Sequence, residues 1–458
     1  MKKEQLKTII LTLLIFSSVI LSIQIWFSNP VWSGRYSLSA LLNTFKKPKS
    51  DLNINDTGAF NSVFSPRSYV FTYNDGRLFF STTETEAKAV RSAFNNAIKS
   101  AFSAQNTAVI SESDWQSVLK SSSISADYSV PVSTSALADF LGTGGAGGIT
   151  LSSFDQAAIT FDQIVTNAYI CFRSSKENTQ VRIPLSDSRE VKQIYEQFSG
   201  RTKESYAYAF EMNLDKPVNS TAVQQKVVFG SYVLIPLETI TMNTIHGESI
   251  AVADDAAAEN IIELFGYNPK TARKFSESNG TVLYIDNKAT IKLNSQSGRI
   301  EYTATDGGGV LLSDSGKLSA VATGCGKLID SIFNLFSIDP NVTLFINSPL
   351  DNDNANEYTI TFDYLFNGNN IQGENHGCKI VISNGKIKSF TANIKNYTLI
   401  SETGTENAQN VLDNLYTSLN RNALSVTKLY TGYIDSNQAM PLCWRAEVEG
   451  TDEIITVK

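Results

Sequence analysis

The residues most suggestive of chemistry are the six from Gly142 to Gly147, which fit the pattern G-x-G-x-x-G. That pattern binds a dinucleotide only when a strand enters it and a helix leaves it, so that the helix N-terminus faces the phosphates. Here residues 133–141 have the apolar spacing of a helix, and residues 149–152 do not start one. We therefore interpret the glycines as a helix C-cap followed by a loop, not as a nucleotide site.

The acidic stretch Asp351–Glu357 suggests calcium binding, because carboxylate and amide oxygens are the ligands that this ion prefers. An EF-hand loop would place an oxygen-bearing side chain at Ala355, Gly at Asn356 and Glu at Phe362, and the sequence meets none of these requirements. Two interpretations stay open, namely a loose cation site of another geometry and a solvated hairpin turn.

The chain has two histidines, His246 and His376, and both are predicted to lie in loops without a nucleophile motif nearby. Its four cysteines show no C-x-x-C pair, so a zinc site is difficult to assemble. They could form one or two disulfides or remain buried free thiols, with all three pairings open: Cys171, Cys325, Cys378 and Cys443. We predict no enzyme, no catalytic residue, no metal and no cofactor.

The sequence predicts a transmembrane helix over residues 8–27, which would anchor the rest of the chain to a membrane. No charged side chain lies between Lys7 and Arg35, and a helix of twenty residues spans the ~30 Å hydrocarbon core. The lysines before the span place residues 1–7 in the cytoplasm, and Trp26 and Trp32 suit the outer headgroup layer. A cleaved signal peptide would have a shorter apolar core and small residues at its end, which this segment lacks.

Charge limits the partners of the remaining chain. The net charge of the whole chain is −7, and without the first 27 residues, which hold three Lys and one Glu, 35 basic side chains stand against 44 acidic ones. An acidic exterior argues against nucleic acid and against docking on anionic lipid by charge alone. Proteins or neutral surfaces are the expected partners.

The pattern of apolar residues predicts an α+β protein: one N-terminal transmembrane helix, then an extracytoplasmic array of domains built from antiparallel sheets and helices. The last two domains share the order helix, antiparallel strands, helix, three-stranded meander, and are predicted to be similar to each other. Apolar spacing predicts helices that include residues 90–102, 318–333 and 411–419, and capping residues predict a helix that starts at 254 or 255 and stops at Gly266. The predicted strands include 226–236, 281–285, 289–293, 299–305 and 386–397. The predicted segments are a cytoplasmic tail (1–7), the transmembrane helix (8–27), a stalk (28–66), an N-terminal domain (67–160), a middle domain (161–313) and a C-terminal domain (314–458).

Polar side chains inside the apolar span are candidate contacts with another transmembrane helix. Ser18 and Ser22 form a small-xxx-small step, and Ser17 and Gln24 lie seven residues apart on one face. A Gln amide in hydrocarbon is costly unless a neighbouring helix supplies hydrogen-bond partners. The alternative is that Gln24 reaches the outer interface, since it is three residues from the end of the span.

The chain resembles the YycH family in several segments taken in order. They are Gln24-Ile25-Trp26, Phe265-Gly266-Tyr267-Asn268-Pro269, Gly280-Thr281-Val282-Leu283-Tyr284, Tyr430-Thr431-Gly432-Tyr433 and Pro441-Leu442-Cys443-Trp444-Arg445. The C-terminal part is also similar to YycI, and residues 100–160 resemble the family least.

This resemblance implies a membrane-anchored, non-catalytic regulator of the WalK sensor histidine kinase of Gram-positive bacteria. The implied partners are the kinase and a YycI-like protein, contacted through the transmembrane helices, and the implied process is cell-wall metabolism. The alternatives are an extracytoplasmic module that binds cell-wall or small-molecule ligands and a secreted or anchored enzyme of unfamiliar type.

Overall fold

The computed structural model describes residues 64–457 apart from fifteen short gaps. The gaps are 74–75, 82–86, 105, 163–166, 202–205, 217–218, 221–222, 225–226, 306–307, 351–355, 408–409, 412–413, 415–423, 437 and 450–453. The predicted tail, transmembrane helix and most of the stalk lie outside the described residues, as does most of the acidic stretch 351–357. Among the described residues, no helix is both long and apolar enough to cross a membrane.

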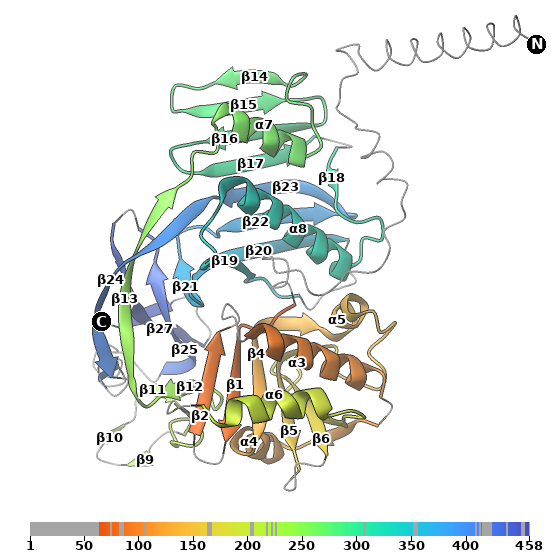
Figure 1. Cartoon of the computed structure of the whole chain (residues 1–458), viewed down its shortest axis with the longest axis vertical. Helices are drawn as coiled ribbons and strands as arrows, with labels where there is room; N and C mark the ends of the chain where they lie inside the picture. The colour runs from red at the N-terminus through yellow and green to blue at the C-terminus, as the bar shows by residue number, and fades with distance from the viewer. Residues whose placement is uncertain are drawn as a thin grey trace, which may run out of the picture. The chain divides into compact units, whose positions relative to one another are not determined.

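The first large element is an antiparallel sheet of seven strands (Figure 1). In pairing order these are β2 (Gly76–Ser81), β1 (Ser68–Tyr73), β4 (Ser123–Ser133), β5 (Ser153–Phe161), β6 (Ala168–Ser174), β7 (Thr179–Pro184) and β3 (Ala108–Ile110). The predicted domain boundary at residue 160 falls inside this sheet, because β5 pairs with β6 from Gln156↔Arg173 to Phe161↔Ala168.

Helices cover both faces of the seven-stranded sheet, so successive residues of its central strands are buried in different cores. Ala157 and Phe172 face the core shared with α3 (Ala87–Phe102), α5 (Thr134–Leu141) and α6 (Arg189–Ser199). Ala158 and Cys171 face a smaller core formed with α4 (Glu112–Lys120) around Trp115. This alternation is the two-residue period of a strand.

Local signals in the sequence account for the helices. The buried positions of α3 recur every three or four residues, which is one face of a helix. Ser111 and Asp114 form a reciprocal capping box at the start of α4. The α5 helix begins at an N-cap, Ser133, and ends at Gly142, whose φ of 71° is left-handed. The interpretation of Gly142 as a C-cap is therefore confirmed.

The second large element is a sheet of fourteen strands. Its main path is β14 (Arg273–Ser276), β15 (Thr281–Ile285), β16 (Ala289–Asn294), β17 (Arg299–Ala304), β23 (Lys386–Asn393), β22 (Cys378–Ser383), β20 (Glu357–Phe366), β21 (Asn369–Gln372), β25 (Leu424–Ile434), β27 (Cys443–Val448) and β28 (Ile454–Val457). Three short strands pair beside this path: β11 (Val227–Phe229), β18 (Val310–Leu311) and β19 (Val342–Ile346).

Two helices pack on the fourteen-stranded sheet, namely α7 (Asp255–Leu264) and α8 (Leu318–Phe336) (Figure 1). Phe265, at the C-cap of α7, stacks on Tyr302 of β17 with a centroid distance of 4.7 Å and meets Phe390 of β23 edge-on at 5.3 Å. One aromatic residue therefore packs on both strands where β17 pairs with β23.

Smaller sheets complete the described fold. A three-stranded sheet contains β24 (Lys395–Asn407), β13 (Thr239–Ser249) and β26 (Met440–Pro441), and two strand pairs join β8 (Tyr206–Tyr208) to β12 (Leu234–Pro236) and β9 (Asn219–Ser220) to β10 (Val223–Gln224). Most of the helix that the sequence predicts over 411–419 lies outside the described residues.

Several predicted strands differ from the observed ones. The strand predicted over 386–397 is two strands, because the chain leaves the large sheet at Ile394, whose N–H donates to the carbonyl of Gly298 at 2.8 Å. The strand predicted over 226–236 is broken at Gly230, whose N–H donates to the carbonyl of Val426. The sequence does not predict β4, β13 and β14, since Pro131, Gly247 and a run of charged residues weaken their strand patterns.

The placement of His246 in a loop is wrong, because it lies in β13 opposite Thr398 of β24. The next residue, Gly247, makes the segment resemble a loop in the sequence, and the same glycine is required by the packing of the strand. A Cβ atom on Gly247 would lie 2.7 Å from the ring of Tyr397, so only glycine lets that buried ring pack across the ribbon.

Glycine substitutions test the close backbone contact at the point where the chain leaves the fourteen-stranded sheet. Gly298 has a φ of +65°, and a Cβ there would lie 2.2 Å from the carbonyl oxygen of Ile394, whereas Gly266, with a φ of +78°, has open space around it. Both changes to Ala carry the left-handed strain of about 1–2 kcal/mol, but only Gly298→Ala adds a backbone clash. We expect Gly298→Ala to lower the free energy of unfolding in urea by at least about 2 kcal/mol more than Gly266→Ala. Equal losses would contradict the close approach of Gly298 to Ile394.

Candidate functional site

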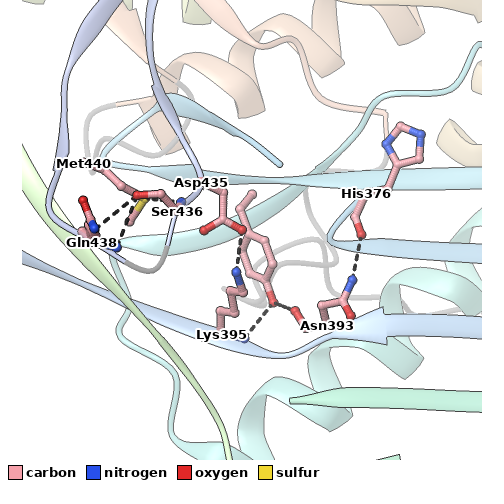
Figure 2. Close-up of polar contacts among 8 residues, drawn as sticks. His376, Asn393, Lys395, Asp435, Ser436, Gln438 and Met440 are labelled. Atoms are coloured by element: carbon pink, nitrogen blue, oxygen red, sulfur yellow. Dashed lines mark hydrogen bonds and ion pairs between the residues drawn. The ribbon is translucent and has the colours of Figure 1, made fainter. Parts of the chain in front are cut away.

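A connected cluster of polar residues lies where β23 passes into β24 (Figure 2). Lys395, the first residue of β24, places its Nζ 2.5 Å from Oδ2 of Asp435, which follows β25. Their side chains are 19% and 17% exposed, so the ion pair is largely shielded from water. Coulomb attraction is stronger in such a setting than at the surface, and the loss of stability on removing either partner is larger.

Tyr364 of β20 connects this ion pair to the end of β23. Its hydroxyl donates to the carbonyl oxygen of Asn393 at 2.8 Å and accepts from the N–H of Lys395 at 3.2 Å. The ring meets that of Tyr397 edge-on, with a centroid distance of 5.3 Å. One buried side chain therefore satisfies two backbone groups at the point where the strand changes sheet.

Burial sets the ionisation of both tyrosines. It raises the pKa of Tyr364 well above the usual value, and burial together with the negative charge of Asp435 raises the pKa of Tyr397 further. Both phenols are therefore neutral at physiological pH. They act as hydrogen-bonding and packing groups, and neither is suited to serve as a base.

Backbone contacts hold Asp435 from the other side. Its N–H donates to the carbonyl of Gln372 at 2.7 Å, which continues the parallel pairing of β21 with β25. In the turn that follows, the N–H of Ser436 lies 3.3 Å from Sδ of Met440. The ion pair thus joins the end of β25 in the fourteen-stranded sheet to the start of β24 in the β24–β13 ribbon.

A second cluster connects the beginning of the described chain to the C-terminal strands. The guanidinium carbon of Arg67, just before β1, lies 4.6 Å from the ring centroid of Tyr430 and 5.7 Å from that of Phe345. In addition, Leu350 donates its N–H to the carbonyl of Pro131 at 2.9 Å. The cation–π contacts therefore connect the first described strand to β19 and β25.

The residues predicted to contact a partner lie outside the described residues, so the structure does not place them: Ser17, Ser18, Ser22 and Gln24. The glycine motif at 142–147 follows a helix, as the sequence predicts. His376 lies in a loop, and its Nδ1 is 2.8 Å from Oδ1 of Asp363. No group of three or more His, Cys, Asp or Glu side chains that could hold a metal occurs among the described residues.

The cysteines are free thiols, so the disulfide alternative is wrong for this structure. Cys171, Cys325 and Cys378 are buried, and Cys443 is half-buried with its Sγ donating to the carbonyl of Gly432 at 3.2 Å. Burial raises the pKa of Cys171 to about 12 and raises the pKa of Cys325 and Cys378 as well. These thiols behave as small apolar side chains.

Sequence reasoning missed Lys395 and Asp435. They are 40 residues apart, and a lysine after a strand or an aspartate in a turn is common in any acidic chain. The only signal was indirect, because the segments 430–433 and 441–445 that carry the family resemblance flank Asp435.

The described residues form an α+β protein in which the polar cluster at Lys395 and Asp435 connects strands of two sheets. Residues 4–200 match the model of the YycH protein, N-terminal domain, which confirms the resemblance to the YycH family over that part of the chain. The fold is similar to that of the crystal structure of YycH from Bacillus subtilis, with a TM-score of 0.57 and 12% sequence identity over 88% of this chain and 97% of that one. The chain matches none of the curated proteins with which it was compared. The similarity of its C-terminal part to YycI stays a prediction.

The shielded ion pair is tested by removing its positive charge. Lys395→Met leaves Asp435 charged and poorly solvated, so we expect a loss of about 2–4 kcal/mol in the free energy of unfolding. The matched control is Arg189→Met, which breaks the pair with Asp187, where the side chains are 87% and 54% exposed, and it should cost less than about 1 kcal/mol. Denaturant unfolding of both variants measures the difference, and similar losses would show that Lys395 and Asp435 are not shielded.

Thiol accessibility tests the state of the cysteines. Because burial keeps three thiols protonated and out of contact with water, we expect an aromatic disulfide reagent under mildly alkaline conditions to react with Cys443 alone in the folded chain. In guanidinium chloride without reductant, all four thiols should react. A smaller count in denaturant would instead demonstrate a disulfide.

Proposed function

We propose that this chain is a non-catalytic regulator of a sensor histidine kinase in a two-component system of the WalK (YycG) type. The observation that carries the proposal is the match of residues 4–200 to the YycH N-terminal domain. The proposed role is to adjust the output of the kinase in signalling for cell-wall homeostasis, and the proposed partners are the kinase and a YycI-like protein.

The proposal places the chain in the cell membrane as a single-pass protein with its N-terminus in the cytoplasm and its bulk outside. The apolar run over 8–27 and the lysines before it support this orientation. The family match starts at residue 4 and so includes the proposed span. A regulator that crosses the membrane once must transmit any effect across the bilayer through that helix.

Within the span, Ser17, Ser18, Ser22 and Gln24 are the proposed contacts with the helices of the partners. Ser18 and Ser22 allow close approach of another helix, and the amide of Gln24 gains hydrogen bonds there that lipid cannot supply. On the outer side, the cation–π contacts of Arg67 with Phe345 and Tyr430 offer a route by which the C-terminal strands could act on the start of β1.

The test replaces Gln24 by Leu in the full chain and follows co-purification with the kinase from mild detergent, together with a reporter of kinase output. A transmembrane hydrogen bond is worth ~0.6–2 kcal/mol, so we expect about a 3- to 30-fold loss of association. Thr12→Val is the matched control, because Thr12 lies on another face of the helix and should have no effect.

A second variant separates the span from the body. Replacing residues 1–33 with an unrelated transmembrane segment should abolish the change in kinase output while the chain remains in the membrane. Full regulation by this exchanged chain would contradict action through the helix, and failure of the native chain to associate with any histidine kinase would contradict the proposed function itself.

A further inference from the structure

The fourteen-stranded sheet ends in an exposed strand, β14, whose outer side has no neighbour among the described strands (Figure 1). All four of its residues are exposed, and Phe275 is 50% exposed. It is the one aromatic side chain among the large exposed apolar residues of the described chain. Ile285 of β15, 37% exposed, lies opposite Arg273 on the same sheet face. An apolar corner therefore adjoins a free backbone edge.

The register identifies which backbone groups are free. The N–H of Glu277 donates to the carbonyl of Thr281 at 2.8 Å, and Phe275 lies opposite Leu283. In an antiparallel pair, hydrogen-bonded residues alternate with residues whose backbone groups point away. Arg273, Phe275 and Glu277 therefore direct their backbone groups toward β15, so those of Lys274 and Ser276 point outward.

Side chains alternate in the same way. Lys274 lies on the face covered by α7, where its Nζ is 2.7 Å from Oδ1 of Asp255. Arg273, Phe275 and Glu277 share the opposite face, since they are two residues apart along the strand. The exposed face of β14 therefore presents a positive, an aromatic and a negative side chain in that order.

We propose that β14 pairs antiparallel with β14 of a second copy of this chain, about a two-fold axis at Phe275. In that register Lys274 faces Ser276 of the second copy, so the two outward-pointing residues of each strand satisfy one another. The two Phe275 rings meet at a non-hydrogen-bonded position, where side chains approach most closely. Arg273 faces Glu277 of the second copy, twice by symmetry, and the charges are complementary.

Two features oppose this pairing and limit its strength. Short edge strands that carry Arg and Lys often resist pairing, and a net charge of −7 repels a second copy at low salt. Glu277 offsets the repulsion between the basic residues, because it places a negative charge opposite Arg273 of the second copy. An interface of one strand pair is small, so the dimer is weak and depends on concentration. The proposal does not rest on the proposed function.

Cross-linking through the axis tests the register. In the full chain, Phe275→Cys places two thiols opposite each other, so mild oxidation should give a covalent dimer visible without reductant. The matched control is Lys292→Cys, which is exposed on β16 in the same sheet but two strands from the edge, and it should cross-link no more than the unmodified chain. A dimer yield for Phe275→Cys no greater than for Lys292→Cys would overturn the proposal.

Charge exchange tests the contact with the second copy. In the Phe275→Cys background, Arg273→Glu or Glu277→Arg alone should lower the initial rate of cross-linking at least several-fold, and the two together should restore it. Both side chains are exposed, so the thermal midpoint should be unchanged, which would exclude unfolding as the cause. Equal rates in the background protein, the two single variants and the double variant would show that the register is wrong.

Discussion

The fold depends on the pairing of β17 with β23, which runs from Arg299↔Asn393 to Thr303↔Ser389. These strands are far apart in the chain, and their ladder joins the meander β14–β17 to the C-terminal strands in one sheet. Phe265 packs on one residue of each strand in that ladder, Tyr302 and Phe390. Backbone hydrogen bonds and apolar burial act at the same place, so neither half of the sheet can be displaced without exposing the core of the other.

The chain leaves this sheet at Ile394 and enters the ribbon of β24 and β13. A change of sheet leaves backbone groups that strand pairing cannot satisfy, and Tyr364 and Gly298 supply partners for them. The ion pair of Lys395 with Asp435 lies at the same point. A polar junction is thus required by the topology.

An open sheet of this size has edges that must be covered, shortened or paired. β24, an edge strand of the separate three-stranded sheet, carries two register shifts against β13 that break the regular ladder. β14 has no such irregularity against β15, and it presents a charged, aromatic face. The edge strands β14 and β24, which belong to different sheets, therefore differ in regularity, and β14 is the better suited to accept another strand.

The sequence by itself determined the elements whose signals are local. The spacing of apolar residues predicted α3 and α8, a capping aspartate and Gly266 predicted α7, and Gly142 predicted the end of α5. Strand patterns predicted the meander β15–β17. It also predicted the α+β class and the resemblance to the YycH family, and it argued against the nucleotide and EF-hand motifs. Periodicity and caps suffice here because their energies come from residues within one or two turns.

Only the tertiary structure decided which strands pair and which polar residues meet. The partnership of Lys395 with Asp435, the position of Arg67 between Phe345 and Tyr430, and the strand setting of His246 all depend on contacts distant in sequence. β4, β13 and β14 form because neighbouring strands satisfy their backbone groups, and their own residues favour strands only weakly. Burial and long-range pairing override local preference at these places, and no pattern along the chain records them.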